Sequence, residues 1–262
     1  EEHIEFQQDN FIVFDLETTE DIIEDDSRTE AFLKLLSLSV VSTNDEKPTC
    51  IIRHDDTDQA CESVVQQFID IIEAKATQFV SSLPPKFRHS LDYMAKIEKE
   101  RRDTQKRMTQ AGERYKLELF PTEWKTYLRS LLTIKVYGFN SSKFDTKVLA
   151  PYFFNLKLRD TDGASTAEKV DFNILKRGSS YFSLGYNCGG AIIQFTDVLN
   201  YLSPTSLSGF LEMTKVPEKK LIFPYQLYKS VDQLINATEF PEFANFWSDL
   251  KNDYSCTQEE YE

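Results

Sequence analysis

Residues 11–20, FIVFDLETTE, begin as an apolar strand and pass through two acidic residues, Asp15 and Glu17. The apolar run before Asp15 predicts a strand buried inside a sheet. Because side chains two residues apart on a strand point to the same side, the two carboxylates are expected to lie next to each other. Such a pair is costly unless a metal ion, a basic side chain or water lies between them.

A second segment, VYGFNSSKFD at residues 136–145, predicts a strand, a turn and the start of a helix. It places Asp145 in the first turn of that helix, beside another buried strand. Asn140 is positioned to hydrogen-bond a ligand, and Phe144 to stack on a base. Both acidic and amide side chains also have ordinary structural interpretations, Asn140 as a turn former and Asp145 as a favourable acid at a helix start.

Ligands of α/β sheets bind at the carboxyl ends of the strands, which is where these acids are predicted. Three carboxylates from two strands can hold two divalent cations about 3.5–4 Å apart. Hard oxygen ligands favour Mg²⁺ or Mn²⁺. The pattern of Asp15, Glu17 and Asp145 therefore predicts a two-ion site.

The remaining elements follow from hydrophobic periodicity and turn residues. Residues 18–30 are interpreted as an acidic loop, and residues 160–169 are polar and expected to be mobile. The other predicted strands are 32–43, 49–54, 133–140, 172–177, 181–187 and 191–199. The predicted helices are 62–75, 84–116, 121–132 and 143–154, with further short helices after residue 199. A hairpin-rich opening followed by β-α units indicates an α/β domain with a mixed central sheet.

Composition limits the function classes. The 262 residues carry a net charge of −13, which argues against a protein that holds duplex nucleic acid through a broad electrostatic face. Residues 86–116 are the exception, with 10 basic and 5 acidic residues. This segment is either a solvated helical arm or a contact to a nucleic-acid backbone. No apolar stretch approaches the ~18 residues of a membrane span, so no membrane contact is expected.

The cysteines and the first residue bear on cellular context. The four cysteines, Cys50, Cys61, Cys188 and Cys256, lie far apart and form no C-x-x-C pair. We interpret them as reduced thiols of an intracellular protein in the nucleus or cytoplasm. The chain does not begin with Met, and a fragment of a longer polypeptide is the simplest interpretation.

FDLETT (14–19) and GFNSSKFD (138–145) together resemble the first two motifs of the proofreading exonuclease domain of family B DNA polymerases. The likeness is greatest to the protein-primed branch found in phages, linear plasmids, adenoviruses and Maverick/Polinton elements. The resemblance implies that Asp15, Glu17 and Asp145 bind the metal ions. It also implies that Thr18, Asn140 and Phe144 contact single-stranded DNA.

Two later segments resemble the same family. In TDVLNYL (196–202), Leu199 and Leu202 match a strand-binding segment, while Val198 replaces the usual Ser or Thr. In KKLIFPY (219–225), the resemblance places Lys220 at the scissile phosphate and Tyr225 beside it. Without the resemblance, Lys220 is a solvated loop lysine, and Tyr225 and both leucines are core residues. The resemblance covers about residues 10–20 and 133–262.

The family's third motif, Y-x-x-x-D, supplies a fourth carboxylate. YKSVD (228–232) fits the bare pattern but follows FPY too closely. Three interpretations follow. The fourth ligand lies beyond Glu262, its place is taken by Asp232, Asp249 or Asp253, or the site is incomplete. We favour a ligand beyond Glu262.

These observations set the expectations. The fold is an RNase H-like mixed β-sheet flanked by helices, of the DEDD exonuclease type. Residues 1–262 form one exonuclease-like domain with a long charged helical insertion at about 58–130. The expected function is a two-metal-dependent 3′→5′ exonuclease acting on single-stranded DNA 3′ ends. One alternative is a catalytically impaired fold that binds a protein or nucleic acid, with residues 84–116 contacting a partner protein. A second alternative is an RNA-directed exonuclease.

Overall fold

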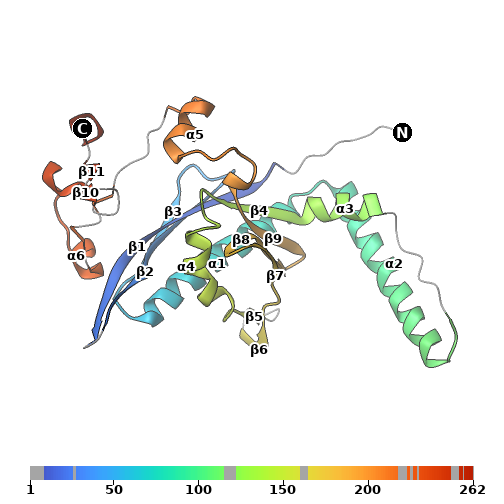
Figure 1. The fold of residues 1–262 in the computed structure, drawn as a ribbon. Helices are drawn as coiled ribbons and strands as arrows, with labels where there is room; N and C mark the ends of the chain where they lie inside the picture. The colour runs from blue at the N-terminus through green and yellow to red at the C-terminus, as the bar shows by residue number, and fades with distance from the viewer. Residues whose placement is uncertain are drawn as a thin grey trace.

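The computed structural model contains a mixed seven-stranded sheet flanked by helices (Figure 1). The described residues are 9–25, 28–114, 122–159, 165–217, 223–224, 227–228, 230–248, 254–255 and 257–261. The strands run in the order β3-β2-β1-β4-β9-β8-β7. Their bounds are β1 Phe11–Asp25, β2 Arg28–Ser42, β3 Thr49–Ile52, β4 Thr133–Gly138, β7 Asn173–Arg177, β8 Ser180–Cys188 and β9 Ala191–Asp197. The α/β class and the mixed sheet are confirmed, and the order is compatible with an RNase H-like fold.

Strands β1 and β2 form a hairpin much longer than the sequence indicated. Their antiparallel pairing continues from Ile12↔Ser42 to Asp25↔Arg28, with a register shift between Glu17 and Thr18. The expectation of an acidic loop at 18–30 is therefore wrong. Thr18, Thr19, Ile22 and Ile23 are β-branched and favour an extended backbone, whereas the acidic composition had suggested a loop.

The three strands at the centre of the sheet are parallel. β1 pairs with β4 through Val13↔Tyr137, and β4 pairs with β9 through Tyr137↔Thr196. On either side, β2–β3 and β8–β7 complete the sheet with antiparallel pairs. Because parallel strands end on the same side, the carboxyl ends of β4 and β9 lie beside the middle of β1, where the first acidic pair occurs.

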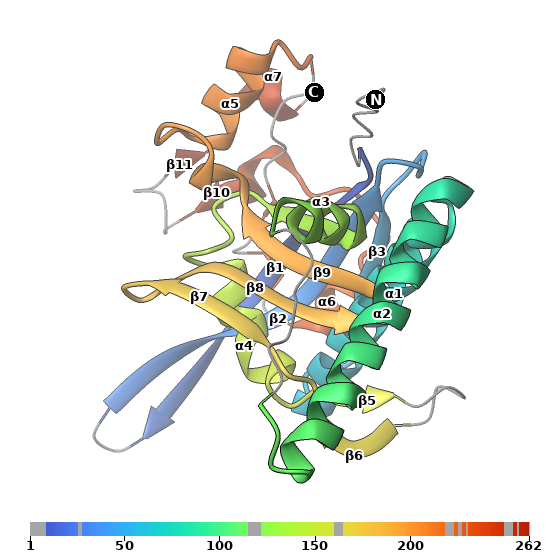
Figure 2. The ribbon, with the colours of Figure 1, turned by 90° about the vertical axis from the view of Figure 1, so that its right-hand side faces the viewer.

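Helices α1 (Asp58–Ser81) and α4 (Asp145–Phe153) cover one face of the sheet (Figures 1 and 2). Buried residues alternate along β1, with Ile12, Phe14 and Leu16 facing these helices. The ring of Phe68 on α1 lies 5.6 Å from that of Phe14 and 6.3 Å from that of Phe195 on β9. Helix α1 thus belongs to the core, although the sequence placed it inside the helical insertion.

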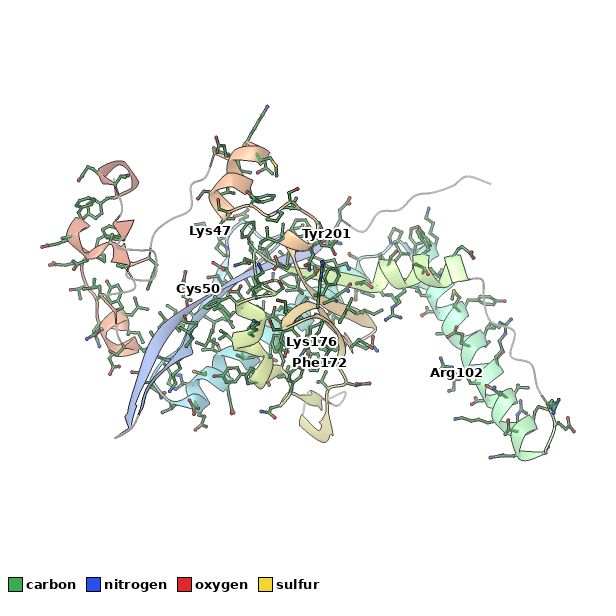
Figure 3. The ribbon with its side chains drawn as sticks, in the orientation of Figure 1. Lys47, Cys50, Arg102, Phe172, Lys176 and Tyr201 are labelled. Atoms are coloured by element: carbon green, nitrogen blue, oxygen red, sulfur yellow. The ribbon has the colours of Figure 1, made fainter. Side chains whose placement is uncertain are left out.

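Helix α2 (Pro85–Gln110) extends away from the sheet (Figure 1). Phe87 is its one buried residue and joins a small cluster with α3 (Thr122–Leu132) through Leu128 and Leu131. The prediction of a charged helix in this region is confirmed for 85–110. Arg102 illustrates its solvated side chains (Figure 3).

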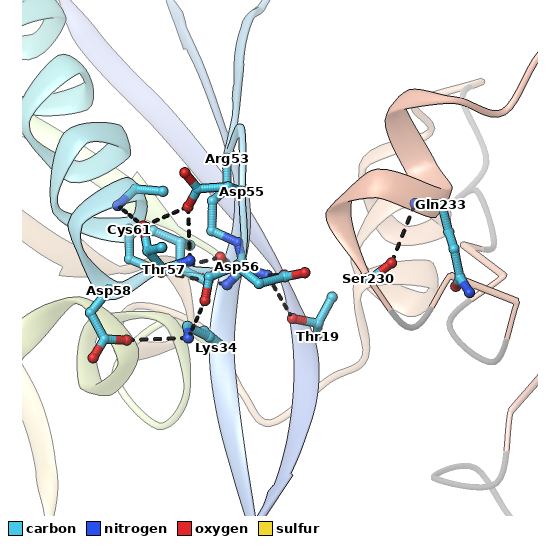
Figure 4. Close-up of polar contacts among 12 residues, drawn as sticks. Thr19, Lys34, Arg53, Asp55, Asp56, Thr57, Asp58, Cys61, Ser230 and Gln233 are labelled. Atoms are coloured by element: carbon cyan, nitrogen blue, oxygen red, sulfur yellow. Dashed lines mark hydrogen bonds and ion pairs between the residues drawn. The ribbon is translucent and has the colours of Figure 1, made fainter.

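A buried arginine ties the first strands to α1 (Figure 4). The guanidinium of Arg53 donates to the Asp56 carboxylate at 2.5 Å, to the Thr19 hydroxyl at 3.3 Å and to the Cys61 sulfur at 3.5 Å. Since an unpaired buried charge would be costly, Asp56 is the contact that makes this burial tolerable. The cluster fixes the end of β3 against β1 and the first turn of α1.

The rest of the chain is built from short elements. Residues 165–169, expected in a mobile segment, form strand β6 (Ser165–Lys169) paired with β5 (Lys157–Arg159). The C-terminal elements are η1 (Val198–Asn200), α5 (Leu207–Thr214), α6 (Val231–Ile235), η2 (Phe243–Asn245), β10 (Trp247–Ser248), β11 (Tyr254–Ser255) and α7 (Gln258–Tyr261). In the described part of the chain, no helix has the length and apolar character needed to cross a bilayer. Cys50, Cys61 and Cys188 are free thiols.

If α1 is part of the core, Phe68→Ala should lower the free energy of unfolding by about 3–5 kcal/mol, because it empties the centre of a ring cluster. Urea denaturation of the wild type and the variant measures this. Tyr93→Ala, on the exposed side of α2, is the matched control and should change the free energy of unfolding by less than about 0.5 kcal/mol. Equal effects of the two substitutions would contradict the placement of α1.

Candidate active site at the strand ends

The acidic pair of β1 lies on the sheet face opposite α1. Asp15 is exposed between buried Phe14 and Leu16, and Glu17 is half-buried. The register of the hairpin shifts immediately after Glu17. Irregularities of this kind re-aim side chains and are frequent beside active sites. The predicted placement of both carboxylates on one side of the strand agrees with the alternation of burial along β1.

The turn from β4 into α4 is unusually tight. A Cβ on Gly138 would lie 2.5 Å from the Ser141 Cβ and 3.0 Å from the Phe14 ring, so only glycine fits. Asn140 adopts a left-handed backbone with φ of 59°, which asparagine tolerates better than most residues. The turn sets the first residue of α4, Asp145, directly behind the strand end.

Asp145 is the electrostatic centre of the site. Its side chain lies in the first turn of α4, and the residue is 6% exposed. Burial, and then the negative charge of Asp15, raise the pKa of Asp145 from 3.8 to about 7; Asp197 and Glu17 add to the effect. The structure therefore brings the three predicted carboxylates close enough to repel one another.

Asp197, which the sequence interpretation did not single out, holds the site together. It closes β9 and is 2% exposed. One carboxylate oxygen accepts from the backbone N–H groups of Asn140 and Leu199, each at 2.9 Å, and the other accepts from that of Ser142 at 3.0 Å. It thereby fixes the turn that carries Asp145. The sequence did contain a signal for Asp197, because AIIQFTD is a third apolar strand that also ends in an acid.

The predicted nucleic-acid contacts lie around this edge. Thr18 is half-buried on β1, Asn140 is exposed, and the Phe144 ring is partly exposed at the start of α4. Leu199 is half-buried in η1, where its backbone is fixed by Asp197. The exposed parts of these residues leave room for contact with a ligand.

The remaining predicted residues either lie outside the described part of the chain or belong to another element. Lys220 and Tyr225 lie outside the described residues, as do Asp249 and Asp253, two candidates for the fourth carboxylate. Asp232, the third candidate, is exposed in the first turn of α6.

The donor set fits a hard divalent cation in its chemistry, since Asp15, Glu17 and Asp145 offer only carboxylate oxygens. Across the described ranges, no group of three or more His, Cys, Asp or Glu side chains stands in an arrangement that would hold an ion. The Asp197 carboxylate is engaged by backbone N–H groups. The mutual repulsion recorded at Asp145 is the kind of interaction that a bound cation would offset.

Comparisons with known protein families, with curated proteins and with solved structures find no match to this chain.

The raised pKa of Asp145 predicts a pH-dependent stability in the presence of a chelator. Between pH 3.8 and about 7 the folded state holds a proton that the unfolded state releases, so this contribution is complete below pH 3.8 and is lost progressively as the pH rises to about 7. Asp145→Asn should remove that loss and raise the free energy of unfolding at pH 8 by about 2–4 kcal/mol. Asp103→Asn, on exposed α2, should follow the wild type. Parallel pH profiles for wild type and Asp145→Asn from urea titrations would contradict the assignment.

Loss of the Asp197 carboxylate should loosen the turn. Asp197→Ala leaves buried backbone donors without their acceptor and is expected to lower the free energy of unfolding by about 2–4 kcal/mol. Amide hydrogen exchange at Asn140 and Ser142 should accelerate in the same variant, which a uniform destabilisation would not produce selectively. Asp171→Ala, at an exposed acid before β7, is the control. Unchanged protection of the two amides would contradict the role given to Asp197.

Proposed function

We propose that the chain is a metal-dependent 3′→5′ exonuclease with an RNase H-like fold of the DEDD exonuclease type. The proposal is supported by the sheet, in which an antiparallel β1-β2-β3 unit is extended by parallel β4 and β9. The observation that carries it is that the negative charges of Asp15 and Glu17, on β1, act on the buried Asp145 at the start of α4. Burial first, and then these charges, raise the pKa of Asp145 to about 7.

Each carboxylate has a role in this mechanism. Asp15, Glu17 and Asp145 would hold two Mg²⁺ or Mn²⁺ ions. When bound, such ions supply a water nucleophile and stabilise the charge of the leaving oxygen of a phosphodiester. Asp145 is the first residue of α4, where the positive end of the helix dipole favours the ionised carboxylate that a cation requires.

The remaining groups position the 3′ end. Asn140, exposed in its left-handed turn, presents its side-chain amide to the ligand, and Phe144 presents a ring edge or face to the terminal base. By resemblance, Lys220 neutralises the scissile phosphate and Tyr225 lies beside it. Single-stranded DNA is the proposed substrate. RNA remains the alternative, since a protein group at the 2′-hydroxyl would decide between them.

A second candidate function is an exonuclease-derived module that binds a partner protein. Two observations favour it: the carboxylates of the described residues do not converge on one ion position, and α2 extends a charged surface away from the domain. This candidate predicts that the wild-type chain is inactive with Mn²⁺ and that α2 is required for partner binding.

Removing the acidic pair tests the enzyme directly. Asp15→Ala/Glu17→Ala should reduce shortening of a 5′-labelled single-stranded oligonucleotide in Mn²⁺ by about 100-fold or more, because the ions lose their ligands. Gel analysis of the products measures the rate and the direction of cleavage. The matched control is Glu100→Ala/Asp103→Ala, which removes two exposed acids from α2 and should retain wild-type activity. Undiminished cleavage by the Asp15/Glu17 variant would overturn the proposal, and an inactive wild type would favour the second candidate.

A further inference from the structure

Three aromatic side chains form a row on the sheet face opposite α1 and α4. Phe11 and Val13 on β1 are 40% and 37% exposed, in contrast to the buried residues that alternate with them. The Phe11 and Tyr137 ring centroids are 5.9 Å apart at 74°, and those of Tyr137 and Tyr201 are 6.4 Å apart at 76°. Tyr201, at the outer end of the row, is 63% exposed (Figure 3). The row is therefore continuous and accessible.

The row lies beside the proposed carboxylates. Tyr137 pairs with Val13, two residues before Asp15 and on the same side of β1. At ~3.3 Å per residue, the distance from Phe11 to Asp15 along the strand is about 13 Å. Tyr201 follows Asp197 by four residues. An extended chain whose end reached the carboxylates would thus pass over or beside these rings.

Hydrogen bonds anchor the backbone beside Tyr201. The Asp197 carboxylate accepts from the Leu199 N–H and so fixes the start of η1, and the Asn200 side chain donates to the Phe182 carbonyl at 3.0 Å. These bonds position Tyr201 immediately after η1. Burial and the neighbouring Tyr201 raise the pKa of Tyr137, so its hydroxyl stays neutral and adds no negative charge. The backbone that carries Tyr201 is therefore preorganised.

A positive charge accompanies the rings. Lys135 pairs with Phe11 in register, and its side chain lies on the same face of β4. Its ammonium group donates to the Gln194 carbonyl, while the Gln194 amide donates to Ser183 at 2.7 Å. The ammonium carries three donors and Gln194 takes one of them, so Lys135 has donors left for a phosphate. Rings together with a cation match bases and phosphate better than an apolar protein surface.

We infer that Phe11, Tyr137 and Tyr201 form a stacking platform for the bases of a single-stranded nucleic acid, with Lys135 contacting its phosphate backbone. The inference rests on the proposed function, because the strand is the one whose 3′ end reaches Asp15, Glu17 and Asp145. The platform binds the nucleotides that precede that end. It is distinct from Asn140 and Phe144, which are assigned to the terminal nucleotides.

Nucleic-acid binding measured under conditions that prevent cleavage tests the platform separately from catalysis. A fluorescein-labelled short oligo(dT) is titrated with protein in EDTA, and fluorescence anisotropy gives the Kd. Tyr201→Ala should weaken binding about 10-fold, within the range for one base–aromatic stack. Tyr201→Phe keeps the ring and should bind within about 2-fold of the wild type. Tyr93→Ala removes a ring that is 61% exposed on α2 and should leave the Kd unchanged. Lys135→Gln should weaken binding and make it less dependent on salt.

The outcomes separate this inference from the proposed function. Wild-type affinity in Tyr201→Ala, or absent binding by the wild type, overturns the platform even if Mn²⁺-dependent cleavage is found. Ring-dependent binding supports the platform even if no cleavage occurs, in which case the exonuclease proposal fails alone. Sedimentation of both proteins provides a further check. If Tyr201→Ala alters self-association and leaves oligo(dT) binding unchanged, the row is a protein contact and the inference is overturned.

Discussion

The parallel pairing of β1, β4 and β9 is the constraint on which the rest of the structure depends. It aligns Val13, Tyr137 and Thr196 across three strands, so that residues beyond them meet at one edge. The three strands differ at that edge. Strand β1 continues past it, β4 ends in a sharp turn at Gly138, and β9 ends at Asp197. Acids that are far apart in sequence are brought together as a consequence of this register.

Concentrating carboxylates at one edge has an electrostatic cost, and the local structure offsets part of it. Asp197 is buried yet satisfied, because three backbone N–H groups point at its two oxygens. Asp145 has a helix N-terminus but lies near other acids, and its pKa rises to about 7. Asp197 therefore stabilises the turn, whereas Asp145 retains unfavourable electrostatic energy. A site that is destabilised in this way gains most from a cation.

Much of this arrangement was predictable from local sequence. The apolar run before Asp15, the strand and turn of VYGFNSSKFD and the helix start at Asp145 each have a short-range signal, and the structure bears them out. The extended hairpin was missed because acidic composition was weighted above β-branched residues at 18–23. Asp197 and Arg53 were missed for another reason. Some of their partners, Asn140, Ser142 and Thr19, are distant in sequence, and only the register of the sheet brings these residues into contact.

A net charge of −13 limits how such a domain holds a polyanion. Long-range attraction is weak or repulsive for an acidic protein, and the carboxylates at the strand ends add to the repulsion. Base stacking acts at short range and is nearly independent of net charge, so aromatic rings are the contacts best able to supply affinity here. In the proposed complex, the adjacent Lys135 would contact phosphate once the strand has docked. A nucleic-acid-binding surface of this kind would release few counterions and would therefore depend only weakly on salt.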